Sequence, residues 1–305
     1  MRYFSALILS LPLIAFAGAG EAGFDMLRRD FTPASVAIAS ANVGFPQLTA
    51  FGGNPAALAE KTVQIAGAGY VDDPLDLKTG FLYYSRPWKE YVFSARLLYS
   101  DYGTFDRTSV SGEKLGTFGA NDIFVGFSGA RKFDSLLIGI EPGYIISKID
   151  NYSASALTFS AGIQYAPPFI PLTRVGVDIR NLGTNTKKYV SSTTPLPTDI
   201  RIGGSKKLEH LPLTLVAQIN KWQDTDWYFN GGGEFEITKA FLLRAGYSTL
   251  GTDQRSNGTN DAIAGLSAGF GFQYTDYMFD FAYAMQGVVG DRLFLQFSWQ
   301  PPSQR

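Results

Sequence analysis

Along most of the chain, apolar and polar side chains alternate with a period of two residues. In the segment 91–100, Phe93 and Leu97 occupy one set of positions, while Ser94 and Arg96 occupy the other. Successive side chains of a β-strand point to opposite faces of the sheet. This alternation therefore predicts strands with one apolar face and one polar or small face.

Fourteen segments follow this pattern, and most are close to the roughly 9–11 residues that a tilted membrane strand needs. The predicted strands are 62–71, 79–88, 91–100, 122–131, 136–148, 155–166, 173–181, 198–207, 212–222, 227–237, 240–248, 263–274, 277–286 and 291–300.

The connections between these segments alternate in length. Long ones lie at 101–121, 182–197 and 249–262, with short ones such as 132–135 and 274–276 between them. Outer-membrane barrels have short periplasmic turns and longer outer loops, whereas a soluble β-sandwich has no reason to sort its connections in this way. We therefore predict an all-β fold: a transmembrane antiparallel β-barrel of about 14 strands that crosses the bacterial outer membrane many times.

The composition suits a thin wall that faces lipid. Charged residues are only 17% of the 305 residues, aromatic residues are 14%, and there are 33 glycines. The formal charge of −1 provides no electrostatic footprint for nucleic acid. The chain has no cysteine and one histidine, His210, in a predicted turn, so neither a metal site nor a Ser-His hydrolase is expected. We predict no catalytic residue, no cofactor and no enzymatic activity.

The first 22 residues have the features of a signal peptide. Arg2 is followed by an apolar run over 6–17 and by small residues, and the run is too short to span a bilayer as a helix. A buried N-terminal helix is the alternative. Residues 23–60 lack the period of two and form a separate N-terminal segment, 61–300 form the barrel, and 301–305 are a C-terminal tail.

Several motifs resemble those of PorV/PorQ-type outer-membrane proteins and of the wider group of FadL-like barrels. They lie in order along the chain at 23–28, 33–37, 54–59 (Asn-Pro-Ala-Ala-Leu-Ala), 175–183, 195–203, 243–247, 265–271 and 279–284. The resemblance implies a 14-stranded barrel whose N-terminal segment folds into the lumen as a hatch. It also implies one of two roles, binding and shuttling of cargo in type IX protein secretion or passage of hydrophobic small molecules.

If the apolar face of the wall meets lipid, the charged residues of the strands point into the lumen. Because both signs occur in similar number, pairing that holds the hatch is the favoured interpretation, and a binding or permeation surface is the alternative. The candidate lumen residues are Arg96, Asp178, Arg180, Arg201, Glu234, Glu236, Arg244 and Asp280.

The candidate hatch motif consists of Asn54, Pro55, Ala56 and Leu58, which either gate the lumen or cap a short helix. Glycines at 231–233, 265, 269 and 271 either mark bulges and a lateral opening or leave room for the hatch, and we favour the latter.

Three hypotheses of function remain at this stage. The first is a PorV/PorQ-type role in type IX secretion, with secreted cargo proteins and other secretion components as partners. The second is FadL-like transport of a hydrophobic small molecule, and the third is a structural barrel. In all three the barrel contacts outer-membrane lipid.

Overall fold

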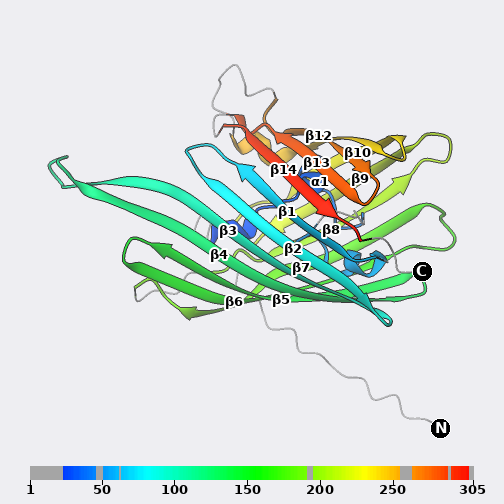
Figure 1. Cartoon of the computed structure of the whole chain (residues 1–305), viewed down its shortest axis with the longest axis horizontal. Coiled ribbons are helices and arrows are strands. Elements are labelled where there is room, and N and C mark those ends of the chain that lie inside the picture. Colours follow the sequence, from blue (N-terminus) through cyan, green and yellow to red (C-terminus); the bar gives the residue numbers. More distant parts are fainter. Residues whose placement is uncertain are drawn as a thin grey trace, which may run out of the picture.

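The computed structural model describes residues 23–45, 51–61, 63–190, 195–254, 263–287 and 290–301. The predicted signal peptide and most of the predicted C-terminal tail lie outside these residues. Within them, fourteen antiparallel strands close into a barrel in which each strand pairs with its neighbours in sequence and β1 pairs with β14 (Figure 1). The prediction of a 14-stranded antiparallel barrel is confirmed.

The strands agree with the predicted segments to within a few residues at most of their ends. They are β1 (Ile65–Asp72), β2 (Lys78–Trp88), β3 (Tyr91–Thr108), β4 (Lys114–Phe133), β5 (Leu136–Ile149), β6 (Tyr152–Tyr165), β7 (Thr173–Lys187), β8 (Asp199–Lys207), β9 (Leu213–Trp222), β10 (Tyr228–Thr238), β11 (Phe241–Ser248), β12 (Leu266–Tyr274), β13 (Tyr277–Ala284) and β14 (Arg292–Trp299).

The wall has the two faces that the alternation predicts. On β3, Phe93 and Leu97 are exposed on the outside, whereas Ser94 and Leu98 are buried. Large apolar side chains recur on the outer face of every strand because lipid, unlike water, imposes no cost on them. Closure also leaves no strand edge with unpaired backbone groups in the hydrocarbon.

The prediction of a long loop over 101–121 is wrong. β3 continues to Thr108 and β4 begins at Lys114, so most of this region is a two-stranded ribbon that projects from one end of the barrel (Figure 1). Phe105 pairs with Phe118 across the ribbon and their rings stack 5.4 Å apart. Such cross-strand aromatic pairs stabilise a ribbon without further strands beside it. Following the predicted topology, we call this end the outer end and the opposite end the periplasmic end.

The two other predicted long connections are only partly described. β7 extends to Lys187, six residues beyond its predicted end, and 191–194 lie outside the described residues. The third connection begins with a short helix, η3 (Thr249–Gln254), and its remainder at 255–262 is also outside them.

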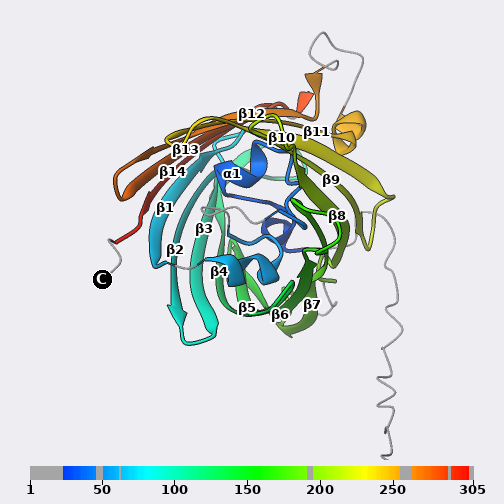
Figure 2. The ribbon, with the colours of Figure 1, turned by 90° about the vertical axis from the view of Figure 1, so that its right-hand side faces the viewer.

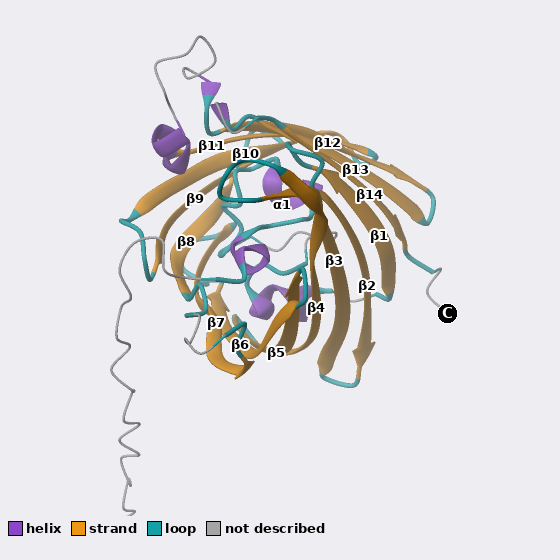
Figure 3. Ribbon diagram, turned by 90° about the vertical axis from the view of Figure 1, so that its left-hand side faces the viewer, coloured by secondary structure: helices purple, strands orange, loops and turns teal. Residues whose placement is uncertain are grey.

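Residues 23–45 and 51–61, which we call the inner segment, lie within the ring of strands (Figures 2 and 3). They include the short helices η1 (Asp25–Arg28), α1 (Pro33–Val36) and η2 (Pro55–Glu60). No helix in the described ranges is long and apolar enough to cross a membrane. The inner segment runs from Gly23, whose N–H donates to the Pro195 carbonyl near the outer end, to β1 at the periplasmic end.

Candidate functional site

One side of the lumen, formed by β1–β6, is filled by apolar side chains. Phe24, Met26, Leu27 and Phe31 of the inner segment are buried there. They belong to one cluster with side chains of the wall, which include Phe81, Tyr83, Leu98, Phe124 and Ile145. Burial of a large apolar side chain contributes about 1.5–3 kcal/mol, so this cluster holds the first half of the inner segment against the wall.

On the other side, formed by β9–β13, the inner segment touches the wall through glycines. A Cβ at Gly246 would lie 2.4 Å from the carbonyl carbon of Ile38, and one at Gly269 would lie 2.8 Å from the Cβ of Ala37. The Oγ of Ser267 accepts from the N–H of Ala39 at 3.1 Å. Gly232 and Gly269 therefore leave room for the inner segment, as favoured above, whereas Gly265 lies in a turn with φ +93°.

Asn54 connects η2 to the wall. Its Oδ1 accepts from the N–H of Ala56 at 2.9 Å, which caps the helix. Its Nδ2 donates to the carbonyl of Val43 at 2.9 Å and to that of Ile163 on β6 at 3.1 Å. Pro55 and Ala56 pack so close to β5 that a Cβ at Gly139 would lie 2.3 Å from the carbonyl carbon of Pro55.

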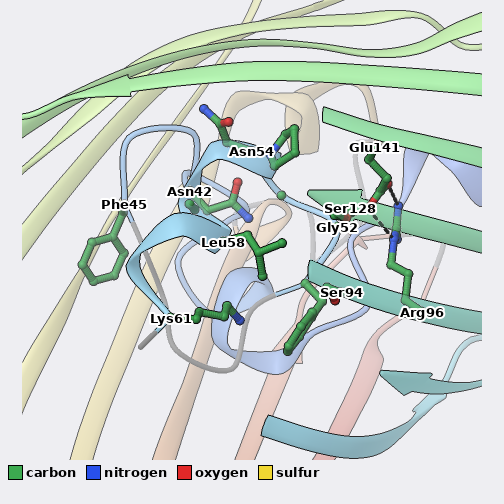
Figure 4. Close-up of a pocket in the computed structure, with 14 residues that line it drawn as sticks. Asn42, Phe45, Gly52, Asn54, Leu58, Lys61, Ser94, Arg96, Ser128 and Glu141 are labelled. Atoms are coloured by element: carbon green, nitrogen blue, oxygen red, sulfur yellow. Dashed lines mark hydrogen bonds and ion pairs between the residues drawn. The ribbon is translucent and has the colours of Figure 1, made fainter. Parts of the chain in front are cut away.

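A small cavity of about 40 Å³ lies between η2 and strands β3–β5 (Figure 4). Leu58 lines it, and Arg96 donates to Glu141 at 2.6 Å on its far side. Ser128 also donates to Glu141, at 2.6 Å. The volume of the cavity leaves space for about one water molecule rather than for an organic ligand.

Lys61 closes the same cavity at the end of η2 (Figure 4). Its Nζ lies 3.6 Å from the centre of the Phe51 ring. Burial lowers the pKa of Lys61 to about 7. Its charge state therefore changes near neutral pH while the inner segment is in place.

A chain of ion pairs crosses from the inner segment to β7 and β8. Arg180 bonds Asp199 at 2.8 Å and Asp30 of the inner segment at 3.4 Å. Arg201 pairs with Asp178 and donates to the Asn42 Oδ1 at 3.2 Å. Burial would raise the pKa of Asp30, but Arg180 and Arg201 outweigh it and hold that pKa below its usual value.

A second group of charges lies near the periplasmic end. Arg244 bonds Glu234 at 2.7 Å and Asp280 at 2.6 Å, and Glu236 lies 3.6 Å from Lys207. Each of the eight candidate lumen residues thus has an oppositely charged partner within 4 Å. Sequence reasoning missed Glu141 and Asp199, which pair with Arg96 and Arg180, although the period of two marks the inward positions of the strands. It also missed Arg292 of β14 and its partner Asp73, which directly follows β1.

Two larger chambers of about 360 Å³ each lie at opposite ends of the β9–β13 side. The outer chamber is lined by Trp222, Tyr228 and Leu250 and opens beside η1. The inner chamber is lined by Pro212, Lys239 and Gln273 near the periplasmic turns. Between them stands the contact of Ala37 and Ile38 with the glycines of β10–β12.

No protein-family model matches the sequence, and no curated protein is similar to it in sequence. The fold is similar to several solved structures. The Ralstonia pickettii toluene transporter TbuX superposes with a TM-score of 0.63 at 13% identity, over 89% of this chain and 98% of that chain.

Two further similar structures belong to the same group of barrels. The monoaromatic hydrocarbon channel CymD gives a TM-score of 0.61 at 13% identity, over 89% of this chain and 97% of that chain. A Pseudomonas aeruginosa FadL homologue gives a TM-score of 0.54 at 14% identity, over 89% and 98% respectively. At such identities the likeness shows the fold, a FadL-like outer-membrane barrel.

Proposed function

We propose that this protein is not an enzyme and admits small hydrophobic molecules across the outer membrane. The observation that carries the proposal is the pair of chambers of about 360 Å³ each on the β9–β13 side, with the Ala37–Ile38 contact beside them. Movement of the inner segment at its contact with the glycines of β10–β12 would join the two chambers. The similarity in fold to toluene and monoaromatic hydrocarbon carriers supports the same function.

The test is uptake of radiolabelled toluene by cells or liposomes that contain the full-length protein. Ala284 lines the outer chamber, so Ala284→Trp fills it. Ala95 on β3 belongs to the lipid-facing set of positions, so Ala95→Trp is the matched control. We expect uptake to fall at least tenfold with Ala284→Trp and to stay unchanged with Ala95→Trp. Equal uptake by the two variants rejects a route through the outer chamber.

The type IX secretion role is the competing proposal, and one observation favours it. The ribbon of β3 and β4 exposes Val110 and Leu115 outside the barrel. Exposed apolar side chains on a rigid projection suit a protein partner. Shortening the ribbon by removing 104–118 would abolish cargo attachment if this role is correct and would leave toluene uptake unchanged if it is not.

A further inference from the structure

The lipid-facing surface of β5, β6 and β7 changes from apolar to polar at the outer end of the barrel. Nearer the middle of the wall, its exposed side chains include Ile140, Leu157 and Phe159. Toward the outer end, β5 exposes Tyr144 and then, four residues later, Lys148. Aromatic residues mark the membrane–water interface of such barrels. Lys148 lies roughly 13 Å further along its strand, which places it at the level of the lipid headgroups.

A bulge in β7 brings a second lysine to the same surface. Ser155 of β6 pairs with Lys187, whereas Ala156 pairs with Asn185, so Thr186 is an extra residue between these two pairs. An extra residue interrupts the alternation of faces along a strand. Thr186 and Lys187 therefore both lie on the lipid-facing side, and both are exposed.

The two lysines meet at Ser153 of β6. Lys148 stands directly opposite Ser153 in the register of β5 and β6, which places their Cβ atoms about 4.5–5.5 Å apart. The Nζ of Lys187 donates to the Oγ of Ser153 at 2.5 Å. We call Lys148, Ser153 and Lys187 the lysine patch. Both lysines are exposed and Ser153 is half-buried, so a molecule outside the barrel can reach all three side chains.

The positive charge of the lysine patch is not compensated within the described part of the chain, where neither lysine forms an ion pair. Asp150 is the acidic residue nearest to Lys148 in sequence, but it is bound by Arg107 of the ribbon. Because like charges repel each other, an anion between the two ammonium groups would stabilise both. The patch is therefore a site for an anionic group that comes from outside the protein.

Hydroxyl groups around the lysines favour a sugar phosphate over a simple anion. The Oγ of Ser153 accepts from Lys187 and keeps its own hydrogen for a further acceptor. Next to it, the Oγ1 of Thr186 donates to the Oη of Tyr144 at 3.4 Å on the exposed surface. Lipid A, the glycolipid of the outer leaflet, carries phosphates on a sugar backbone and has several acyl chains. It thus matches the charges, the hydroxyl groups and the apolar surface below them.

We propose that the lysine patch binds the phosphorylated headgroup of an outer-leaflet glycolipid of the lipid A type. A phosphate lies between the Nζ atoms of Lys148 and Lys187 and accepts from Ser153. Sugar hydroxyl groups contact Thr186 and Tyr144, and the acyl chains lie on the apolar surface of β5 and β6. This inference goes beyond the proposed function, because the patch is outside the barrel and neither chamber takes part.

The test is native mass spectrometry of the purified full-length protein in a neutral detergent. The probes are bisphosphorylated lipid A, the same lipid without its phosphates, and phosphatidylglycerol, with inorganic phosphate as a competitor. We expect bisphosphorylated lipid A to bind about tenfold more tightly than the dephosphorylated lipid, and more tightly than phosphatidylglycerol. Equal binding of either comparison lipid overturns the proposal. Displacement of lipid A by millimolar phosphate overturns it too, since the site would then recognise free phosphate.

Variants assign the binding to the patch. Lys148→Gln combined with Lys187→Gln should weaken lipid A binding about tenfold, because one exposed charge contact contributes up to about fivefold. Lys148→Arg combined with Lys187→Arg keeps both charges and should retain binding. The matched control is Lys78→Gln, since Lys78 is also exposed at the outer end but stands opposite Asp72 and Asp101. Equal effects of the double glutamine variant and the control overturn the assignment.

The inference and the proposed function fail independently. The double glutamine variant should keep the gel mobility of the unheated barrel and the toluene uptake of the unmodified protein. A fall in lipid A binding alone supports the patch. A fall in both lipid A binding and uptake would show that the substitutions act on the whole barrel, and it overturns the assignment to the patch.

Discussion

The two sides of the lumen hold the inner segment by different means. On the β1–β6 side, large side chains such as Phe31 and Phe124 interdigitate, and the cavities described there have volumes of about 10, 20 and 40 Å³. On the β9–β13 side, backbone meets backbone at Gly246 and Gly269, with a chamber of about 360 Å³ at either end. Side-chain packing fixes a segment, whereas a short contact at glycines positions it without filling the space around it.

The strongest test of this comparison removes the inner segment from both sides. Deletion of residues 23–52 should leave an assembled barrel, because every pair of neighbouring strands bonds independently of the segment. The lumen should then conduct ions, with single-channel conductance in planar bilayers at least tenfold higher than that of the full chain. Unchanged conductance would mean that the segment does not close the pore.

Glycine substitutions should have different effects on the two sides of the lumen. Gly246→Ala places a methyl group against Ile38 where chambers give the segment space to move, so it should produce a leak in planar bilayers with little loss of stability. Gly139→Ala places a methyl group against Pro55, beside which the cavity has a volume of only about 40 Å³, so it should destabilise the protein by about 1–3 kcal/mol.

Gly80→Ala is the control for both substitutions, because a Cβ there meets nothing within 4 Å. The single-channel conductance of this variant and the urea concentration at its unfolding midpoint should match those of the unmodified protein. The comparison is contradicted if Gly246→Ala and Gly139→Ala behave alike in both measurements.

Buried ion pairs should differ in their contribution to stability according to how far the arginine is buried. Arg201 is almost fully buried against Asp178, so Arg201→Met leaves an uncompensated carboxylate and should destabilise the protein by about 3–5 kcal/mol. Arg96 is more exposed, and its partner Glu141 also accepts a hydrogen bond from Ser128. Arg96→Met should therefore destabilise the protein less than Arg201→Met does. Unfolding of each variant in urea is measured by the gel mobility of unheated samples. A further Asp178→Asn substitution should restore part of the loss in Arg201→Met but none in Arg96→Met.

A further expected effect is a pH dependence of the closed state. The pKa of Lys61 is lowered to about 7 by burial, from 10.5, so the docked segment binds fewer protons than the undocked one between these values. The binding of the inner segment to the barrel wall, which we call docking, should therefore be weakest below pH 7. Its free energy should become more favourable as the pH rises toward 10.5, by up to about 1.4 kcal/mol per pH unit.

Leak conductance of the Gly246→Ala variant reports on this docking and should fall from pH 6 to pH 9. Adding Lys61→Met should make the leak independent of pH in this range. Adding Lys132→Met, which removes an exposed lysine paired with Glu60, is the control and should preserve the dependence. An identical pH profile with and without Lys61 would show that another group is responsible.

The sequence by itself determined the strands, their number and the face that each residue occupies. The period of two is a local property of extended backbone, and lipid on one side makes the pattern unambiguous. For this reason Phe93 could be placed outside and Arg96 inside from the sequence alone. The ribbon at 104–118 was missed because its polar residues look like a loop, and only the pairing of Phe105 with Phe118 identifies it as strand.

Only the tertiary structure decided which inward groups meet. Asp30 and Arg180 are separated by 150 residues, and no periodicity relates them. The same holds for the contact between Ile38 and Gly246. Local alternation assigns a residue to the lumen, but the partner it finds there depends on the closure of the barrel and the course of the inner segment through it.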